Sequence, residues 1–271
     1  MKKFEKWQGC GNDFVIIDSR ADSDIDDAEK ISQVCDRHFG IGADGVIYVL
    51  PSMIADVRMR IFNADGSEAE MCGNGIRCFT KFLLDGKAKK KLKVETGAGI
   101  LTVKVIGENV TVDMGEPILN AKKIPVAGYG EEKVIGEEIE VDGKIFKMTC
   151  VSMGNPHCVI FVDDVEKIAL AELGKKFEVH EKFPKHTNTE FVQVVGENIL
   201  RMRVWERGSG ITLACGTGAC ATAVAANLNN LSGKSAEVRL DGGTLKIEWQ
   251  NDNHIYMTGA AEKVFSGQLS F

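Results

Sequence analysis

The sequence predicts an α+β protein made of two pseudo-symmetric duplicated domains, each a curved mixed sheet or barrel around a central helix. Two observations lead to this prediction. Short motifs return in the same order 143 or 144 positions later in the chain. Between them, most segments have the β-branched content and partial alternation of strands, and only a few look like apolar helices. The 271 residues are enough for two domains that each bury a core.

The repeat sets the expected domain boundaries. "VRMRIF" at 57–62 matches "LRMRVW" at 200–205, and the offset slips by one between "GILTVKV" at 99–105 and "GTLKIEW" at 243–249. Several ordered matches at a nearly constant spacing indicate a duplication. The predicted parts are an N-terminal domain, a C-terminal domain and a final strand that returns to the first domain, over 1–115, 116–260 and 261–271.

The elements of each half follow from local composition. Strand signals lie at 14–18, 45–50, 55–62 and 100–114 in the first half. An apolar helix is expected after each of two Cys-Gly motifs, and two further helices are expected elsewhere, at 74–85, 217–231, 27–37 and 165–176. A sheet with one apolar helix can bury that helix by wrapping around it.

The composition excludes several classes of function. The net charge of −6 and the pI of 5.5 indicate no basic face for a nucleic acid. The N-terminus has no signal-peptide pattern, and the longest weakly polar stretch, 211–228, is rich in Gly, Thr and Ala rather than in the leucines of a membrane span. We therefore expect a cytoplasmic protein without a nucleic-acid or membrane partner.

The eight cysteines are expected to be reduced thiols, because no export signal precedes them. No C-x-x-C motif occurs. The closest pairs, Cys72/Cys78 and Cys215/Cys220, are too widely spaced for the common zinc knuckles. We expect no bound metal.

Cys72 in "CGNG" and Cys215 in "CGTG" each stand directly before a predicted helix. Free N–H groups and the positive end of the helix dipole lower the pKa of a cysteine at such a position. The following glycines let a carboxylate approach the backbone N–H groups. A purely structural reading, in which each cysteine is a buried residue at a helix start, explains either one alone equally well.

The pairing of the two thiols favours chemistry. Symmetry-related elements of a duplicated protein commonly face one cleft, so two thiols and two helix starts could flank one substrate carboxylate. One thiolate would remove the proton at the α-carbon, and the opposite thiol would deliver a proton to the other face. The helix ends would stabilise the enolate-like intermediate, so the reaction needs no cofactor.

Polar residues flank both motifs at matching positions. Asn63 aligns with Glu206, Asn12 with Asn155, and Gly45 with Asn188. His157 and Glu206 are candidates to tune one thiol each, and Arg207 to bind a second carboxylate as a fork. Taken singly, His157 could be structural, and the Asn-Gly and Asn-Pro pairs could be turns.

Five motifs together carry a family resemblance. They are "GNDFVIID" at 11–18, "FNADGSEAEMCGNGIRC" at 62–78, "VSMGNPHCVIFVDD" at 151–164, "ERGSGITLACGTGAC" at 206–220 and "YMTG" at 256–259. In this order and over nearly the whole chain, they resemble the diaminopimelate epimerase family. The resemblance implies a cofactor-independent isomerase of lysine and peptidoglycan precursor biosynthesis, which interconverts L,L- and meso-diaminopimelate, with its active site in the interdomain cleft. It also implies that the protein can form a homodimer.

The resemblance assigns roles to individual residues. Cys72 and Cys215 would be the two bases, with Cys72 taking the proton from the L,L isomer, and His157 and Glu206 would adjust the thiols. Backbone N–H groups would surround the reacting carboxylate, namely those of Gly73, Asn74, Gly216 and Thr217. The remaining positions would bind the distal end of a diamino diacid, namely Asn12, Asn63, Asn155, Asn188, Glu206 and Arg207.

The chain departs from the family pattern at two places, and alternatives stay open. "GCGNDF" places an extra Cys10 where "GLGNDF" is usual, and Gly45 stands where some relatives have glutamine. "GIGADG" at 40–45 formally matches a dinucleotide motif but does not follow a strand. The nearest alternative is a PLP-independent racemase or epimerase of another amino acid or bis-amino acid. A Cys/His hydrolase would leave Cys215 without a role, and a non-catalytic binding protein would need neither thiol.

Overall fold

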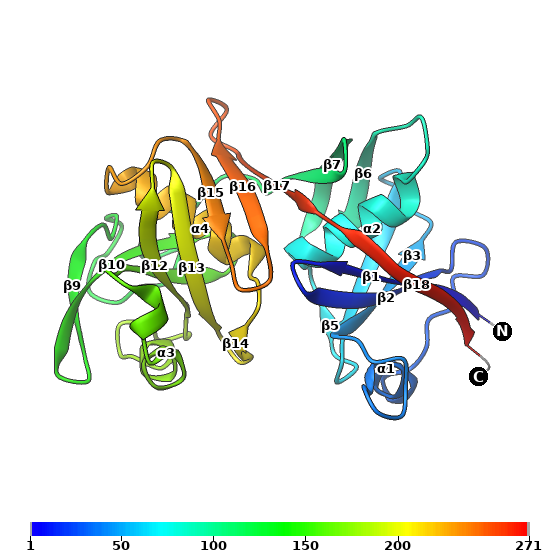
Figure 1. Cartoon of the computed structure of the whole chain (residues 1–271), viewed down its shortest axis with the longest axis horizontal. Helices are drawn as coiled ribbons and strands as arrows, with labels where there is room; N and C mark the ends of the chain where they lie inside the picture. Colours follow the sequence, from blue (N-terminus) through cyan, green and yellow to red (C-terminus); the bar gives the residue numbers. More distant parts are fainter. Residues whose placement is uncertain (1, 270–271) are drawn as a thin grey trace. The chain divides into compact units, whose positions relative to one another are not determined.

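The computed structural model describes residues 2–269. The chain forms two compact units, one running to Asp113 and resuming at Thr258, and the other covering Met114–Met257. The second division falls inside strand β17 (Ile255–Ala260). Each unit contains a mixed sheet and few helices, so the predicted α+β class is confirmed (Figure 1).

The first unit is a curved mixed sheet. Its strands are β1 (Lys2–Gly9), β2 (Asn12–Asp18), β3 (Gly45–Leu50), β4 (Val57–Asn63), β5 (Glu68–Ala69), β6 (Lys91–Thr96), β7 (Gly99–Ile106), β8 (Asn109–Asp113) and β18 (Glu262–Leu269). Most neighbours are antiparallel, but β2 pairs with β3 and β4 pairs with β6 in parallel. The last strand, β18, returns to pair with the first, Lys2 opposite Leu269. The segment predicted as one strand over 100–114 is two strands, because Gly107 makes a turn at φ +57°.

Helix α2 (Gly73–Leu84) lies at the centre of the first unit. Eleven of its residues are buried, and it contacts strands on several sides, including β1, β2, β3, β7 and β18 (Figure 1). Helix α1 (Ala28–Cys35) covers the other face of the sheet, where its apolar side packs on Val15, Ile17, Val46 and Tyr48. Every residue of β3 is buried because its two faces are covered by these two helices.

The second unit repeats this pairing scheme. Its strands are β9 (Glu137–Val141), β10 (Lys144–Ser152), β11 (Pro156–Phe161), β12 (Asn188–Gly196), β13 (Ile199–Glu206), β14 (Gly210–Thr212), β15 (Ser235–Arg239), β16 (Thr244–Trp249) and β17. The strands β11 and β12 are parallel, as are β13 and β15, in the places that β2/β3 and β4/β6 occupy in the first unit. Helix α4 (Gly216–Leu228) is buried like α2 and contacts β10, β11, β12, β13, β15 and β16.

Two helices of the second unit differ from their predicted ranges. The helix expected over 165–176 is a 3₁₀ turn, η1 (Val165–Lys167), followed by α3 (Leu170–Glu178), because extended Ile168 interrupts the first turn. The helix expected to reach residue 231 ends at Leu228, since Asn230 adopts the left-handed conformation at φ +58°. An asparagine tolerates that conformation, which ends a helix.

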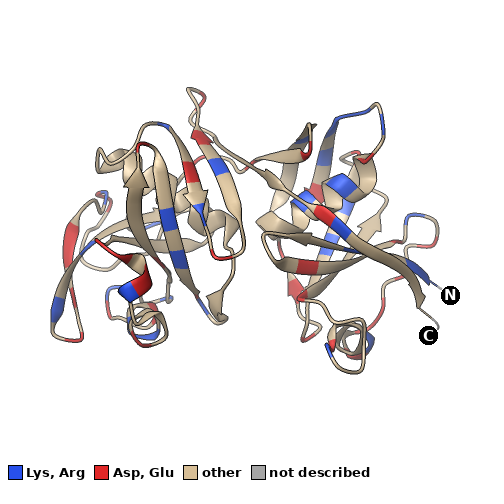
Figure 2. Cartoon of the chain, viewed as in Figure 1, with Lys and Arg blue, Asp and Glu red and all other residues tan. Residues whose placement is uncertain are grey.

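Acidic and basic residues are scattered over the strands and loops of both units (Figure 2). All eight cysteines are free thiols. Among residues 2–269, no helix is both long and apolar enough to cross a bilayer.

Candidate active site

The first predicted thiol lies at the start of α2. Cys72 is the N-cap residue, with extended backbone at φ −136°, and its sulfur accepts the N–H of Gly75 at 3.5 Å. Gly73 and Asn74 occupy the first turn, as predicted from "CGNG". A Cβ on Gly75 would lie 3.0 Å from the Ile61 side chain, so the helix start packs tightly against the sheet here.

Asn12 connects the Cys72 thiol to an acidic residue. Its carbonyl oxygen accepts from the Cys72 thiol at 3.5 Å and from the Asn74 amide at 3.2 Å. Its own amide donates to Asp44 Oδ2 at 2.7 Å. Asp44 is held in turn by Arg37 at 2.7 Å. The side chain of Asn12 is therefore fixed from both ends beside the thiol.

Asp13 strengthens this network from the next position. It forms ion pairs of 2.8 Å with both Lys6 and Arg37. Burial opposes its ionisation, but hydrogen bonds from Arg37 and Lys6 prevail and lower the pKa of the carboxyl to about 2. The "GIGADG" loop that contains Asp44 thus serves to position Asn12 in this structure.

The extra cysteine, Cys10, lies in the turn between β1 and β2 at φ +55°. The buried guanidinium of Arg77 donates to its sulfur at 3.4 Å and also to the carbonyl oxygens of Gly73 and Ala260. Burial raises the pKa of the Cys10 thiol despite the Arg77 charge. Cys10 is thus a protonated thiol at neutral pH.

The second predicted thiol has the same local geometry at the start of α4. Cys215 is the N-cap residue, and its sulfur accepts the N–H of Gly218 at 3.4 Å. Gly216 and Thr217 form the first turn, and the Thr217 hydroxyl lies 3.5 Å from the sulfur. Unlike Cys72, Cys215 is buried, with 5% of its surface exposed.

The prediction that a helix start lowers the thiol pKa is wrong for Cys215. Burial raises the pKa of this thiol well above its ordinary value, and the carboxyl groups of Glu206 and Glu190 raise it further. The hydrogen bonds from Thr217 and Gly218 act in the opposite direction but do not prevail. Desolvation and two nearby carboxyl groups outweigh the helix terminus here, so Cys215 holds its proton at neutral pH.

His157 lies in the second unit and is fully buried on β11. Its Nδ1 lies 2.7 Å from Glu190 Oε1, and its Nε2 lies 3.0 Å from Asn155 Oδ1. The Asn155 amide donates to the Thr217 hydroxyl oxygen at 3.3 Å. His157 therefore connects to the surroundings of Cys215 through Asn155.

The other predicted residues of the second unit form hydrogen bonds within that unit. Glu206 accepts from the Thr212 hydroxyl at 2.5 Å. Asn188 is buried and uses both ends of its amide, since it donates to Pro156 O at 2.7 Å and accepts from the Arg207 backbone N–H at 2.9 Å. Arg207 is exposed, and its guanidinium donates to Lys185 O at 3.0 Å. Of these three side chains, Arg207 is the one with most freedom to bind a carboxylate.

The equivalent positions of the first unit are Asn63 and Gly45. Asn63 is exposed and donates to Ser67 at 3.0 Å. Gly45 pairs directly with Asn63 across β3 and β4. A Cβ on Gly45 would lie 2.4 Å from Phe62 O, so this backbone excludes the glutamine that some relatives carry there.

Sequence reasoning missed Glu190 and the residues that hold Asn12. Glu190 is the one acidic residue within the buried start of β12, "NTEFV", and it aligns with Ile47 at the same offset of 143 that relates the two cysteines. A carboxylate in a strand whose neighbours are buried was the available signal.

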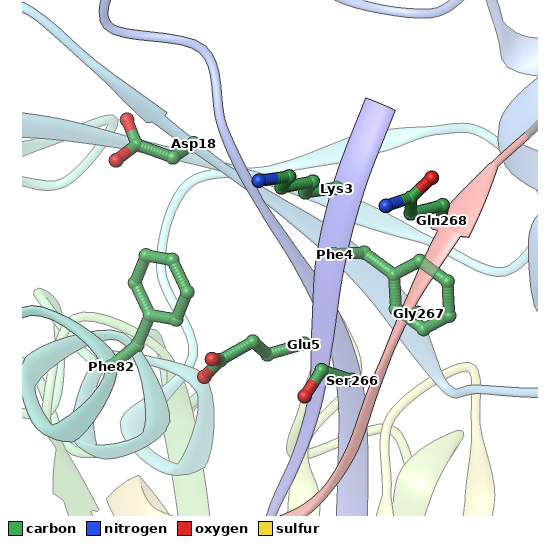
Figure 3. A pocket seen from close by; sticks show the side chains of 8 residues that line it. All are labelled: Lys3, Phe4, Glu5, Asp18, Phe82, Ser266, Gly267 and Gln268. Atoms are coloured by element: carbon green, nitrogen blue, oxygen red, sulfur yellow. The ribbon is translucent and has the colours of Figure 1, made fainter. Parts of the chain in front are cut away.

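A surface hollow of the first unit contains none of the predicted site residues. It lies between β1, β18 and the C-terminal part of α2, and Phe4 and Phe82 contribute its apolar lining (Figure 3). Its polar lining comes from Lys3, Glu5, Asp18, Ser266 and Gln268. No thiol is among these residues, so the hollow is separate from the Cys72 site.

Comparisons with known proteins agree on one family. Residues 4–120 and 149–264 match the family described as diaminopimelate epimerase. A diaminopimelate epimerase of Synechocystis sp. is 53% identical, with 98% of each chain covered. One of Synechococcus elongatus is 54% identical over 98% of each chain, and one of Methanococcus maripaludis is 51% identical over 98% of this chain and 99% of its own.

Solved structures share the fold at low sequence identity. A phenazine biosynthesis protein of the PhzF family from Bacillus anthracis has a TM-score of 0.70 at 19% identity, covering 100% of this chain and 99% of its own. A hydroxyproline epimerase from Agrobacterium vitis has a TM-score of 0.69 at 14% identity, covering 99% and 90%. The family match over most of the chain and the identity above 50% to full-length relatives place this chain in the diaminopimelate epimerase family.

Proposed function

We propose that this chain is a PLP-independent epimerase that interconverts L,L- and meso-diaminopimelate by a two-base thiolate/thiol mechanism. The observation that carries the proposal is that Cys72 and Cys215 N-cap two buried helices at equivalent positions of a duplicated fold. The names of relatives that are 51–54% identical over 98% of the chain support the choice of substrate. Such a reaction belongs to lysine and peptidoglycan precursor biosynthesis in the cytoplasm.

We assign an N-terminal domain, 1–115 with 261–271, and a C-terminal domain, 116–260, each of which contributes one thiol. In the reaction, Cys72 acts on one face of the substrate α-carbon and Cys215 acts on the other. The backbone N–H groups of the two helix starts hold the α-carboxylate, because the N–H groups of a first helical turn and the positive end of the helix dipole favour an anion there. The groups concerned are those of Gly73, Asn74, Gly216 and Thr217.

In the direction from the L,L isomer, Cys72 removes a proton from the α-carbon and Cys215 delivers one to it. The Cys72 thiolate takes the α-proton and becomes a thiol. The electron pair of the broken C–H bond stays on the α-carbon, and the helix N–H groups stabilise the resulting carbanion. The Cys215 thiol then gives its proton to the opposite face and becomes a thiolate. The raised pKa of Cys215 supports this assignment, because a proton donor has to be protonated at neutral pH.

The other predicted residues bind the substrate or adjust the thiols. Glu206 and His157 adjust the thiols, and the effect of Glu206 on the Cys215 pKa supports its part in this. Arg207 binds the distal carboxylate as a bidentate fork. The remaining polar groups of this proposal complete the distal subsite, namely Asn12, Asn63, Asn155, Asn188 and Glu206.

The deciding experiment is incubation of the purified protein with L,L-diaminopimelate in deuterated water without added PLP. We expect meso product with deuterium at one α-carbon. Folded protein that exchanges neither diaminopimelate isomer would overturn the proposal. Exchange of lanthionine or of a single amino acid in place of diaminopimelate would assign the chain to a different racemase or epimerase.

We also propose that the protein forms a homodimer. Strand β18 pairs with β1 on one side, and Val264 and Phe265 on it are 54% and 43% exposed. Exposed apolar side chains on a strand offer a surface for a second copy. Light scattering coupled to size-exclusion chromatography should give twice the chain mass, and a chain mass near 29.5 kDa would contradict it.

A further inference from the structure

Glu190 is a buried acidic residue to which the proposed reaction gives no part. It lies on β12 with none of its surface exposed, beside Val159 of β11 and Val204 of β13. A Cβ on Gly218 would lie 2.7 Å from Glu190 Oε1, so the carboxyl group packs against the first turn of α4. Within residues 2–269, its Oε2 makes no hydrogen bond. An ionisable group in such a place is costly unless its partners compensate.

Hydrogen bonds connect Glu190 to the Cys215 sulfur through three side chains. Glu190 Oε1 lies 2.7 Å from His157 Nδ1, and His157 Nε2 lies 3.0 Å from Asn155 Oδ1. The Asn155 amide donates to Thr217 Oγ1 at 3.3 Å, and that hydroxyl lies 3.5 Å from the sulfur. All of these residues belong to the second unit.

The direction of each hydrogen bond follows from Asn155. Its amide nitrogen faces Thr217, so its carbonyl oxygen faces His157 and has to accept. His157 Nε2 therefore carries a hydrogen, and one further proton is shared between His157 Nδ1 and the Glu190 carboxyl. The Thr217 oxygen accepts from Asn155, which leaves its own hydrogen free to point at Cys215.

The first unit does not have the His157 and Glu190 side chains of this hydrogen-bonded series at its equivalent positions. Phe14 stands where the second unit has His157, and Ile47 stands where it has Glu190, at the offset of 143 that relates Cys72 to Cys215. The Ile47 side chain approaches Gly75 of α2, as Glu190 approaches Gly218 of α4. Because an apolar pair fills this place without a desolvation penalty, the fold itself does not require an ionisable one.

We propose that Glu190 is a positioning residue for proton transfer by Cys215: it fixes His157 with Nε2–H on Asn155, and Asn155 in turn aims the Thr217 hydroxyl at the sulfur. The Thr217 hydrogen bond stabilises the thiolate that remains after Cys215 has given up its proton. This inference rests on the proposed epimerase function. It connects Cys215 to a carboxyl group at a position where the first unit has Ile47.

The test compares two substitutions of Glu190 by steady-state kinetics with L,L-diaminopimelate. Glu190→Ile introduces the residue of the first unit. It should lower kcat at least about tenfold and keep KM within about threefold, because the series of hydrogen bonds loses its terminal carboxyl group. Glu190→Gln should keep kcat within about threefold of the original chain, since its amide can donate to His157 Nδ1 and preserve Nε2–H. Equal kcat for Glu190→Ile and the original chain would overturn the inference.

A double-mutant cycle separates positioning from general damage to the fold. Thr217→Val keeps the backbone N–H but removes the hydroxyl, and should lower kcat on its own. If Glu190 acts through Thr217, the pair Glu190→Ile/Thr217→Val should lose no more than Thr217→Val alone. Fully additive losses would contradict action through Thr217.

Thr189→Val is the matched control. Thr189 is the neighbouring buried residue on β12, and alternation along the strand places its side chain on the other face. It should leave kcat unchanged, and thermal unfolding should show that all variants fold. If the original chain does not turn over diaminopimelate, the proposed function fails. If it does and Glu190→Ile matches it, only the present inference fails.

Discussion

The surroundings of Cys72 and Cys215 differ although the two helix starts are built alike. Both cysteines are N-caps whose sulfur accepts an N–H three residues on, at 3.5 and 3.4 Å. Behind α2 the sheet presents Phe14 and Ile47, whereas behind α4 it presents His157 and Glu190. Cys72 is half-buried and hydrogen-bonded to Asn12, while Cys215 is buried near two carboxyl groups. The duplication has therefore kept the backbone geometry of the helix start, while the side chains around the two thiols have diverged.

The largest effect is expected from removal of either thiol. Cys72→Ala and Cys215→Ala should each lower kcat for epimerisation by at least about 10²–10⁴-fold, because each removes the general acid or base of one face. Deuterium incorporation followed by mass spectrometry measures this loss. Cys10→Gly is the control, since glycine suits the positive φ of residue 10, and it should keep the activity. A silent Cys215→Ala would disprove the two-base scheme.

The ionisable pair behind α4 can be replaced by the apolar pair that stands behind α2. The double variant His157→Phe/Glu190→Ile replaces a buried ionisable pair by apolar residues, which should raise the free energy of unfolding by about 1–4 kcal/mol. It should also lower kcat, because the hydrogen bonds that lead from Glu190 to Thr217 are lost. Chemical denaturation and steady-state kinetics measure the two quantities. A variant that is both less stable and fully active would contradict the asymmetry.

The Cys215 thiol should also titrate above its ordinary range. The pKa of Cys215 is raised, so its thiolate fraction, and with it its alkylation by iodoacetamide, should rise only above the ordinary thiol pKa of about 8.5. Glu206→Gln removes one carboxylate that raises this pKa, so alkylation of Cys215 should begin at lower pH. Peptide mass spectrometry across pH reports each cysteine separately. Alkylation of Cys215 at neutral pH as fast as that of a free thiol would refute the assignment.

The smallest effect concerns the ion pairs that support Asn12. The pKa of Asp13 is lowered to about 2, so its stabilising contribution is present above the unfolded value near 3.8 and is lost as pH falls toward 2. Asp13→Asn should therefore lower the free energy of unfolding by about 1–3 kcal/mol at pH 7 and by progressively less below pH 4. Urea denaturation at several pH values tests this. Asp22→Asn, at an exposed loop position, is the control. A constant difference across pH would contradict the role of the ionised carboxyl.

Much of the fold could be predicted because the sequence contains it twice. The 143-residue offset alone placed Cys72 and Cys215 at equivalent helix starts, and the helices begin within one residue of the predicted positions. Local composition was less informative where a single residue decides, as at Ile168, whose extended backbone delays α3 to Leu170.

The electrostatics of the site could not be predicted from the motifs. "CGTG" indicates a helix start, which lowers a thiol pKa. The pKa of Cys215 is raised instead by burial and by the carboxyl groups of Glu206 and Glu190, and both the burial and the approach of Glu190 depend on how the sheet packs against α4. The same is true of Asn188. The hydrogen bonds of its side-chain amide to Pro156 and Arg207 depend on the pairing of β11 with β12 and on the end of β13. Pairwise contacts of this kind follow from the folded sheet and not from spacing along the chain.

The return of β18 to β1 has a consequence for the order in which the chain is synthesised. Lys2 and Leu269 are partners in one ladder, so β1, which is made before the second unit, can pair with β18 only after the second unit has been made. At about 5–20 residues per second, the second unit is made, and can fold as a unit, while β1 still has an open edge. Loss of the segment after Thr258 should therefore damage the unit that was begun first and spare the one made in between.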